Sequence, residues 1–87
     1  MKQDQALTFP SEFPVKVIGK TSDSFEQTVI MIFRKHAPNL KENALKIKPS
    51  GGGVYTSITI TITATSQEQL DALYRELTKH PDVLMAL

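Results

Sequence analysis

Few residues of this 87-residue chain could take part in catalysis or bind a metal. His36 and His80 are the only imidazoles, and there is no cysteine, which excludes disulfides and thiol chemistry. Each histidine ends a stretch with helical spacing, where a basic side chain stabilises the last carbonyls of a helix. We expect the two stretches to run antiparallel, with the histidines at opposite ends. The sequence therefore predicts no metal, no cofactor and no catalytic residues.

The glycine-rich stretch PSGGGVY, residues 49 to 55, could suggest a phosphate-binding loop. Such a loop needs a following Lys-Ser or Lys-Thr pair that opens a helix. Here the alternating residues YTSITITITAT follow, which is the pattern of a strand. We interpret the glycines as the turn of a hairpin.

Ten basic and nine acidic residues leave a net charge of +1. That balance supplies no overall field toward nucleic acid or anionic lipid. The longest apolar run, Val29 to Phe33, is far too short to span a membrane. We expect a cytoplasmic protein that does not contact a membrane.

The hydrophobic pattern predicts an N-terminal arm, partly flexible, over residues 1–13 and a single domain over residues 14–87. Asp23, with Glu26 three residues later, is predicted to cap the first helix, and Ser66 with Gln69 the second. The predicted order is strand, helix, strand, strand, helix, strand, over residues 15–18, 23–36, 45–48, 54–64, 66–79 and 83–87.

Right-handed crossovers and short connections favour one arrangement for this order, the ferredoxin-like βαββαβ sandwich of the α+β class. Its antiparallel sheet has strand order 4-1-3-2, with both helices on one face. The long third strand is then central, with Ile58, Ile60 and Ile62 toward the helices. Its threonines lie on the open face, which an antiparallel sheet can leave in water.

Several segments, taken in order, resemble a small bacterial family, the YbeD-like proteins, a domain of unknown function. They are FPVKVIG near the front, RKHAP at residues 34 to 38, KPSGGGVYTSITITITAT from Lys48, and LYRELTKHPDVLMAL from Leu73. The resemblance implies a ferredoxin-like fold similar to the ACT regulatory domains that bind amino acids. It implies no established activity and no site residues.

The two predicted sheet edges differ in charge. The second strand carries Lys46, Lys48 and Pro49, which discourage pairing with another strand, whereas residues 83–87 are uncharged. We expect Leu84 and Ala86 to lie beside Ile18 on the open face, with Val83, Met85 and Leu87 toward the core. The predicted contact with a homodimer partner or another protein comprises Ile18, Val83, Leu84, Met85 and Ala86, against the alternative that the C-terminus is merely short and frayed.

A second candidate site is the turn between the first strand and the first helix. It comprises Gly19, Lys20, Thr21 and Ser22, beside the hairpin and the end of the second helix. Helix N-termini favour small anions, and ACT-like domains often bind metabolites near this turn. We predict weak binding of a small metabolite here, against the alternative of a solvated loop.

The open face offers a third candidate, weak binding of single-stranded RNA or DNA through Lys16, Lys46, Lys48 and Tyr55. RNA-recognition motifs share this fold and stack bases on that face, but only one of the usual rings is present. We expect nucleic acid to be the less favoured partner. The sequence predicts a small regulatory or interaction module that is not an enzyme.

Overall fold

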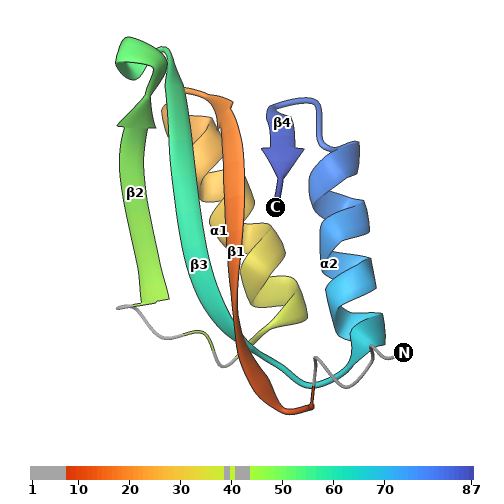
Figure 1. Ribbon diagram of the computed structural model, residues 1–87. Helices are drawn as coiled ribbons and strands as arrows, with labels where there is room; N and C mark the ends of the chain where they lie inside the picture. Colours follow the sequence, from red (N-terminus) through yellow and green to blue (C-terminus); the bar gives the residue numbers. More distant parts are fainter. Residues whose placement is uncertain (1–7, 39, 41–43) are drawn as a thin grey trace, which may run out of the picture.

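The computed structural model describes residues 8–38, 40 and 44–87, and these form a single four-stranded sheet with two helices (Figure 1). A turn of 3-10 helix follows the second strand. The elements are β1 Ser11–Lys20, α1 Asp23–His36, β2 Leu45–Ser50, η3 Gly51–Gly53, β3 Tyr55–Ala64, α2 Gln67–Lys79 and β4 Val83–Ala86.

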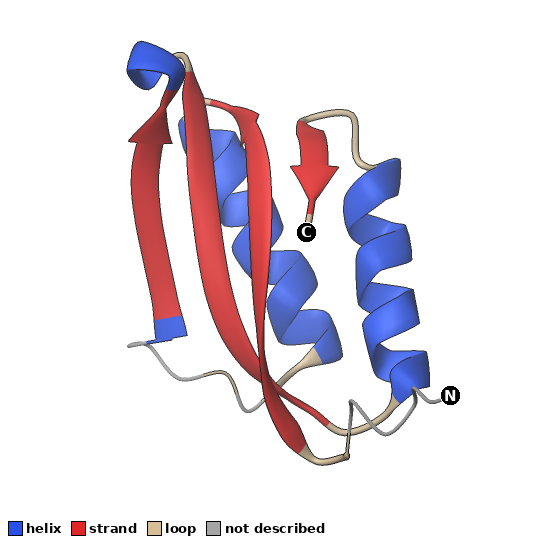
Figure 2. Cartoon of the chain, viewed as in Figure 1, coloured by secondary structure: helices blue, strands red, loops and turns tan. Residues whose placement is uncertain are grey.

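The sheet is antiparallel with strand order β2-β3-β1-β4, which confirms the predicted 4-1-3-2 arrangement. Both helices cover the same face (Figure 2). β1 and β3 pair along their whole length, from Ser11 opposite Ala64 to Lys20 opposite Tyr55. The uncovered side of the sheet is called the open face below.

The core lies between β3, β1 and the helices. Ile58, Ile60 and Ile62 are at most 2% exposed, as the alternating pattern predicted. Burying one such side chain contributes about 1.5–3 kcal/mol. Their partners in the core include Val15, Val17, Phe25, Val29, Phe33, Leu70, Leu73 and Leu77.

β1 begins at Ser11, well before the predicted start at Val15. We had predicted a partly flexible arm over residues 1–13, and the start of β1 lies within its last three residues. Lys16 directs its N–H toward the β4 side, where Leu87 accepts it at 3.1 Å. Pro14, two residues earlier, faces the same side but lies beyond the end of β4, so its missing N–H costs no ladder hydrogen bond.

Ser22, and not the predicted Asp23, caps α1. The Phe25 N–H donates to Ser22 Oγ at 3.0 Å, and Asp23 becomes the first helical residue. Ser66 caps α2 as predicted, with the Gln69 N–H 3.0 Å from Ser66 Oγ. A serine hydroxyl satisfies the otherwise unpaired N–H groups as well as a carboxylate does.

A bulge in β4 changes which of its side chains face the core. Gly19 pairs with Val83 and Ile18 with Met85, so Leu84 is skipped in the register. Ala86 therefore pairs with buried Val17 on the helix side, while Met85 lies beside Ile18 on the open face. Our expectation that Leu84 and Ala86 would flank Ile18, with Met85 and Leu87 toward the core, is wrong. A bulge adds one residue and reverses the alternation beyond it.

Gly19 allows β1, α1 and the α2–β4 connection to approach one another. A Cβ added at Gly19 would overlap the Phe25 ring and the backbone carbonyl oxygen of Asp82. Phe25 is fully buried, so its ring could give way only if the surrounding core shifted with it. Within the described ranges, neither helix has the length and apolar character needed to cross a membrane.

We expect Gly19→Ala to lower the free energy of unfolding by about 1–3 kcal/mol, because overpacking forces side chains and backbone to shift. Urea denaturation measures this change. Gly52→Asn serves as the control, because a Cβ there meets nothing within 4 Å and asparagine tolerates the positive φ of 70°. Equal stability of Gly19→Ala and wild type would contradict the packing argument.

Candidate functional site

The outer edge of β4 is an apolar and unpaired sheet edge in the described part of the chain. Leu84 is 55% exposed, Met85 49% and Leu87 60%. Ile18 is half-buried beside Met85, while Val83 and Ala86 pack against the core. Of the predicted contact residues, the structure thus places Ile18, Leu84 and Met85 at the surface, and Leu87 joins them.

Backbone groups are also available at this edge. Leu87 exchanges two backbone hydrogen bonds with Lys16, at 2.8 and 3.1 Å. Because paired residues alternate along an antiparallel ladder, Ala86 directs its N–H and C=O away from β1, toward the outer edge. At the opposite edge, β2 presents exposed Lys46, Lys48 and Pro49, as predicted.

Lysines gather on the open face around β3. Lys16 and Lys46 lie opposite Thr59 from its two sides, and Lys48 lies opposite Ser57. Lys20, which we predicted for the metabolite site, is the last residue of β1 and lies opposite Tyr55. The prediction did not place Lys20 on the open face, because β1 was expected to end before it. Its even position, in alternation with Lys16, was the available signal.

Tyr55 is half-buried at the end of β3. Its ring lies close to the hairpin turn, since a Cβ added at Gly51 would be 2.9 Å from Tyr55 Cδ2. Ser57, next along the open face, is only 9% exposed and lies between Ile18 and Lys48. The open face therefore presents one partly covered ring, not an aromatic platform.

The turn at residues 19–22 meets the hairpin, as predicted. The Thr21 hydroxyl donates to the Gly53 carbonyl oxygen at 2.8 Å and lies 2.8 Å from the Thr56 hydroxyl. The Thr21 N–H donates to Val54 O at 3.0 Å. Ser22 caps α1, so the polar groups of Thr21 and Ser22 already have partners within the fold. Metabolite binding at this turn stays a prediction.

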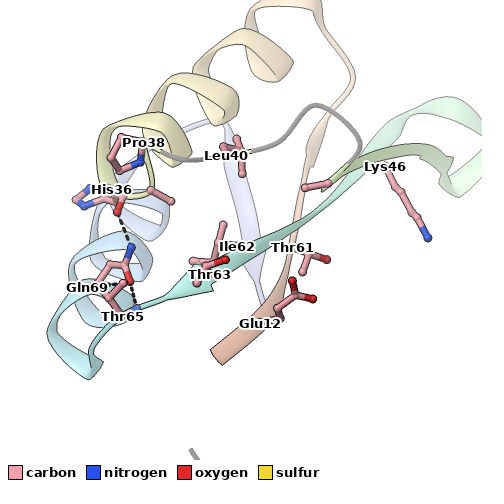
Figure 3. Close-up of a pocket in the computed structure, with 12 residues that line it drawn as sticks. Glu12, His36, Pro38, Leu40, Lys46, Thr61, Ile62, Thr63, Thr65 and Gln69 are labelled. Atoms are coloured by element: carbon pink, nitrogen blue, oxygen red, sulfur yellow. Dashed lines mark hydrogen bonds between the residues drawn. The ribbon is translucent and has the colours of Figure 1, made fainter. Parts of the chain in front are cut away.

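A cavity of about 680 Å³ lies at the other end of the sheet, beyond the last residue of β3 that pairs with β2 (Figure 3). Figure 3 shows His36 and Lys46 at opposite ends of the cavity. Its lining includes Glu12, His36, Pro38, Leu40, Lys46, Thr61, Ile62, Thr63, Thr65 and Gln69. Nothing in the sequence pattern signalled this cavity, because its walls come from separate elements.

At this cavity, the side chain of Gln69 links the two helices by hydrogen bonds. Its Oε1 accepts from the Thr65 N–H at 2.6 Å and the Thr65 hydroxyl at 3.1 Å, and its Nε2 donates to the His36 carbonyl oxygen at 2.7 Å. One amide thus ties the end of α1 to the start of α2. Among the described residues that line the cavity, the titratable side chains of Glu12, His36 and Lys46 do not converge on one point, so these three form no acid–base pair.

His36 and His80 lie at helix ends, as predicted, and each also has an acidic neighbour. His36 Nε2 is 2.7 Å from Glu76 Oε1, and Lys35 Nζ is 3.3 Å from the same oxygen. The hydrogen bond from His36, with help from Lys35, lowers the pKa of the Glu76 carboxyl. His80 lies next to Asp82, at 4.0 Å. Among the described residues, no three histidine, aspartate or glutamate side chains are placed to hold a metal.

Comparison of the sequence with known proteins finds a matching family and similar chains in other bacteria. The family described as "Protein of unknown function (DUF493)" matches residues 4–87. A UPF0250 protein of Nitrosomonas europaea is 40% identical over 87 residues, which cover 100% of both chains. A UPF0250 protein of Ralstonia nicotianae is 41% identical, covering 98% of this chain and 88% of that protein.

Two solved structures share the fold at low sequence identity. The solution structure of protein HP0495 from H. pylori is 16% identical, with a TM-score of 0.76, and covers 100% of this chain and 94% of that one. The ACT domain from GTP pyrophosphokinase of Chlorobium tepidum is 13% identical, with a TM-score of 0.66 over 87% and 84%. The ferredoxin-like, ACT-like fold is therefore confirmed.

We expect Glu76→Gln to be less stable than wild type at about pH 7, and the difference to shrink as the pH falls. A carboxyl whose pKa is lowered by folding contributes stability that is present above its unfolded pKa. That stability is lost as the pH falls through the folded pKa. Thermal unfolding of both proteins, from about pH 7 to about pH 3, measures the difference.

Glu12→Gln is the control for this prediction, because Glu12 is exposed and has no ion pair in the described part of the chain. Its melting temperature should follow that of the wild type across the pH range. A Glu76→Gln protein whose deficit stays constant with pH would contradict the assigned interaction.

Proposed function

Because the chain belongs to the DUF493 family, whose function is unknown, we propose a role from its own surfaces. It acts as a small interaction module without catalytic activity, and it forms a homodimer through the outer edge of β4. The observation that carries this proposal is the strip of exposed or half-buried apolar side chains at that edge, made of Ile18, Leu84, Met85 and Leu87.

An exposed strand edge is a template for another strand, and proteins usually block it with charge, proline, a bulge or a covering element. The bulge of β4 lies at Leu84 and leaves Met85, Ala86 and Leu87 in regular register. β2 carries such devices, with two lysines and a proline. β4 carries no charge, and Ala86 directs a backbone donor and acceptor outward. An added strand would gain those hydrogen bonds and cover the apolar side chains.

A second copy of the chain suits this edge. A two-fold axis beside β4 would place the same strand against itself, antiparallel, and no residue of Val83–Ala86 would bring like charges together. The two strips would then meet on the continuous open face of a joined sheet. This geometry favours self-association over a charged partner.

A regulatory role would require a ligand that alters the dimer. The likeness to an ACT domain concerns the fold alone, so ligand control of the dimer rests on the predicted site at residues 19–22. Lys20 has no partner among the described ion pairs and hydrogen bonds there, unlike Thr21 and Ser22. Assembly is the better supported part of the proposal.

We expect the wild type to dimerise and Met85→Lys to weaken dimerisation by about a hundredfold or more, because it brings two like charges together across the two-fold axis. Sedimentation equilibrium over a range of concentrations measures the dissociation constant. Hydrogen exchange gives a second reading, since the outward Ala86 N–H becomes protected only in the dimer.

Met31→Lys is the matched control. Met31 is 69% exposed on α1, so the same substitution adds a charge to the helix layer and should leave dimerisation unchanged. A wild type that stays monomeric at high concentration would remove the proposal. A Met85→Lys protein that dimerises as tightly as the wild type would place any interface elsewhere.

A further inference from the structure

We infer that the open face binds single-stranded nucleic acid, through a lattice of four lysines with the Tyr55 ring at one end. This surface lies on β2, β3 and β1 and borders the apolar strip at Ile18, but it uses other side chains than the dimer and rests on different observations. The lattice comprises Lys16, Lys20, Lys46 and Lys48.

The first support is the uneven distribution of charge between the two layers of the protein. On the open face the described residues include these four lysines and one acid, Glu12, which lies opposite Thr63 near the far end of β3. The helices and the connection before β4 carry four basic side chains and six acidic ones, namely Asp23, Glu26, Glu68, Asp71, Glu76 and Asp82.

A net charge of +1 conceals this asymmetry. Salt screens charges beyond about 8–10 Å at physiological ionic strength, so an approaching polyanion senses the nearer layer more than the whole molecule. The open face is therefore locally positive even though the protein is nearly neutral. The nearly neutral net charge therefore does not exclude nucleic acid as a ligand of this face.

The second support is the spacing of the lysines. Lys46 and Lys16 lie on the two strands that flank Thr59, about 10 Å apart across the sheet. Lys48 is about 7 Å from Lys46 along β2, and Lys20 lies two positions beyond Ile18 on β1. The four ammonium groups border a track along β3, and none forms an ion pair within the described residues.

The side chains of β3 between these lysines favour nucleic acid over an acidic protein segment. The side chains of Thr59 and Thr61 are half-buried hydroxyls, which can donate to phosphate oxygens and to base edges. Tyr55 ends the track with a ring on which one base can stack. An acidic protein segment would use the lysines but would have no need of the ring.

The test is fluorescence anisotropy with a labelled oligo-uridylate of about 20 nucleotides, longer than one such domain covers. We expect binding that weakens with salt, with a slope of log affinity against log salt of about −3, since four neutralised phosphates contribute about −0.7 each. The double variant Lys16→Gln/Lys46→Gln should bind about tenfold more weakly and have a slope shallower by about 1.4.

The matched control is Arg75→Gln/Lys79→Gln, which removes the same two charges from α2 on the opposite layer. It should bind as the wild type does. Equal losses in the two double variants, absence of binding at low salt, or equal competition by poly-glutamate at matched charge would each overturn the inference. The last result would identify an acidic protein as the partner.

A further variant isolates the ring. Tyr55→Leu keeps most of the apolar volume beside Gly51 and removes the aromatic face. We expect at least about fivefold weaker binding with an unchanged salt slope, because stacking contributes without charge. Wild-type affinity in this variant would overturn the role given to Tyr55.

Discussion

The burial of one face of β3 is the constraint on which the remaining structure depends. Ile58, Ile60 and Ile62 pack against both helices, and β3 is the strand that pairs with both β1 and β2. Side chains alternate along a strand, so a slip of one residue would turn all three isoleucines into water. At about 1.5–3 kcal/mol each, that loss rivals the total stability of a small domain. The register of β3 is thus strongly specified, and it specifies the neighbouring strands.

The same alternation produces the charge asymmetry. Once the isoleucines face the helices, the odd-numbered residues of β3 must face outward, and the pairing register brings the lysines of β1 and β2 onto that side. The open face is therefore a consequence of core packing and not a separate design. Its composition is nevertheless unequal, because lysine occupies positions where serine or threonine would satisfy the strand equally well. A surface that is positive beyond the needs of the fold is where a function can reside.

Sequence patterns predicted those features that depend on periodicity within one element. The helices end where predicted, at His36 and Lys79, and the four strands have the predicted order. The errors occurred where a residue from another element decides the outcome. Pro14 can lie in β1 because β4 ends before reaching it, so no hydrogen bond is lost there. The bulge in β4 moves the side chain of Met85 from the predicted core side to the open face. The choice between Ser22 and Asp23 as cap, one residue apart, depends on where the turn held by Thr21 ends. The contact of His36 with Glu76 joins residues 40 apart, and no local pattern reports such a pair.

The bulge in β4 bears directly on how a partner can attach. Bulges usually discourage edge pairing, because they increase twist and interrupt the row of backbone groups. Here the bulge lies at Leu84, so the regular part of the edge is limited to Met85, Ala86 and Leu87. So short a ladder supplies few hydrogen bonds, each with a net value of only about 1 kcal/mol. The same bulge, however, turns Met85 onto the open face beside Ile18. A partner at this edge must therefore derive most of its affinity from covering the apolar strip, with the backbone pairing setting its orientation.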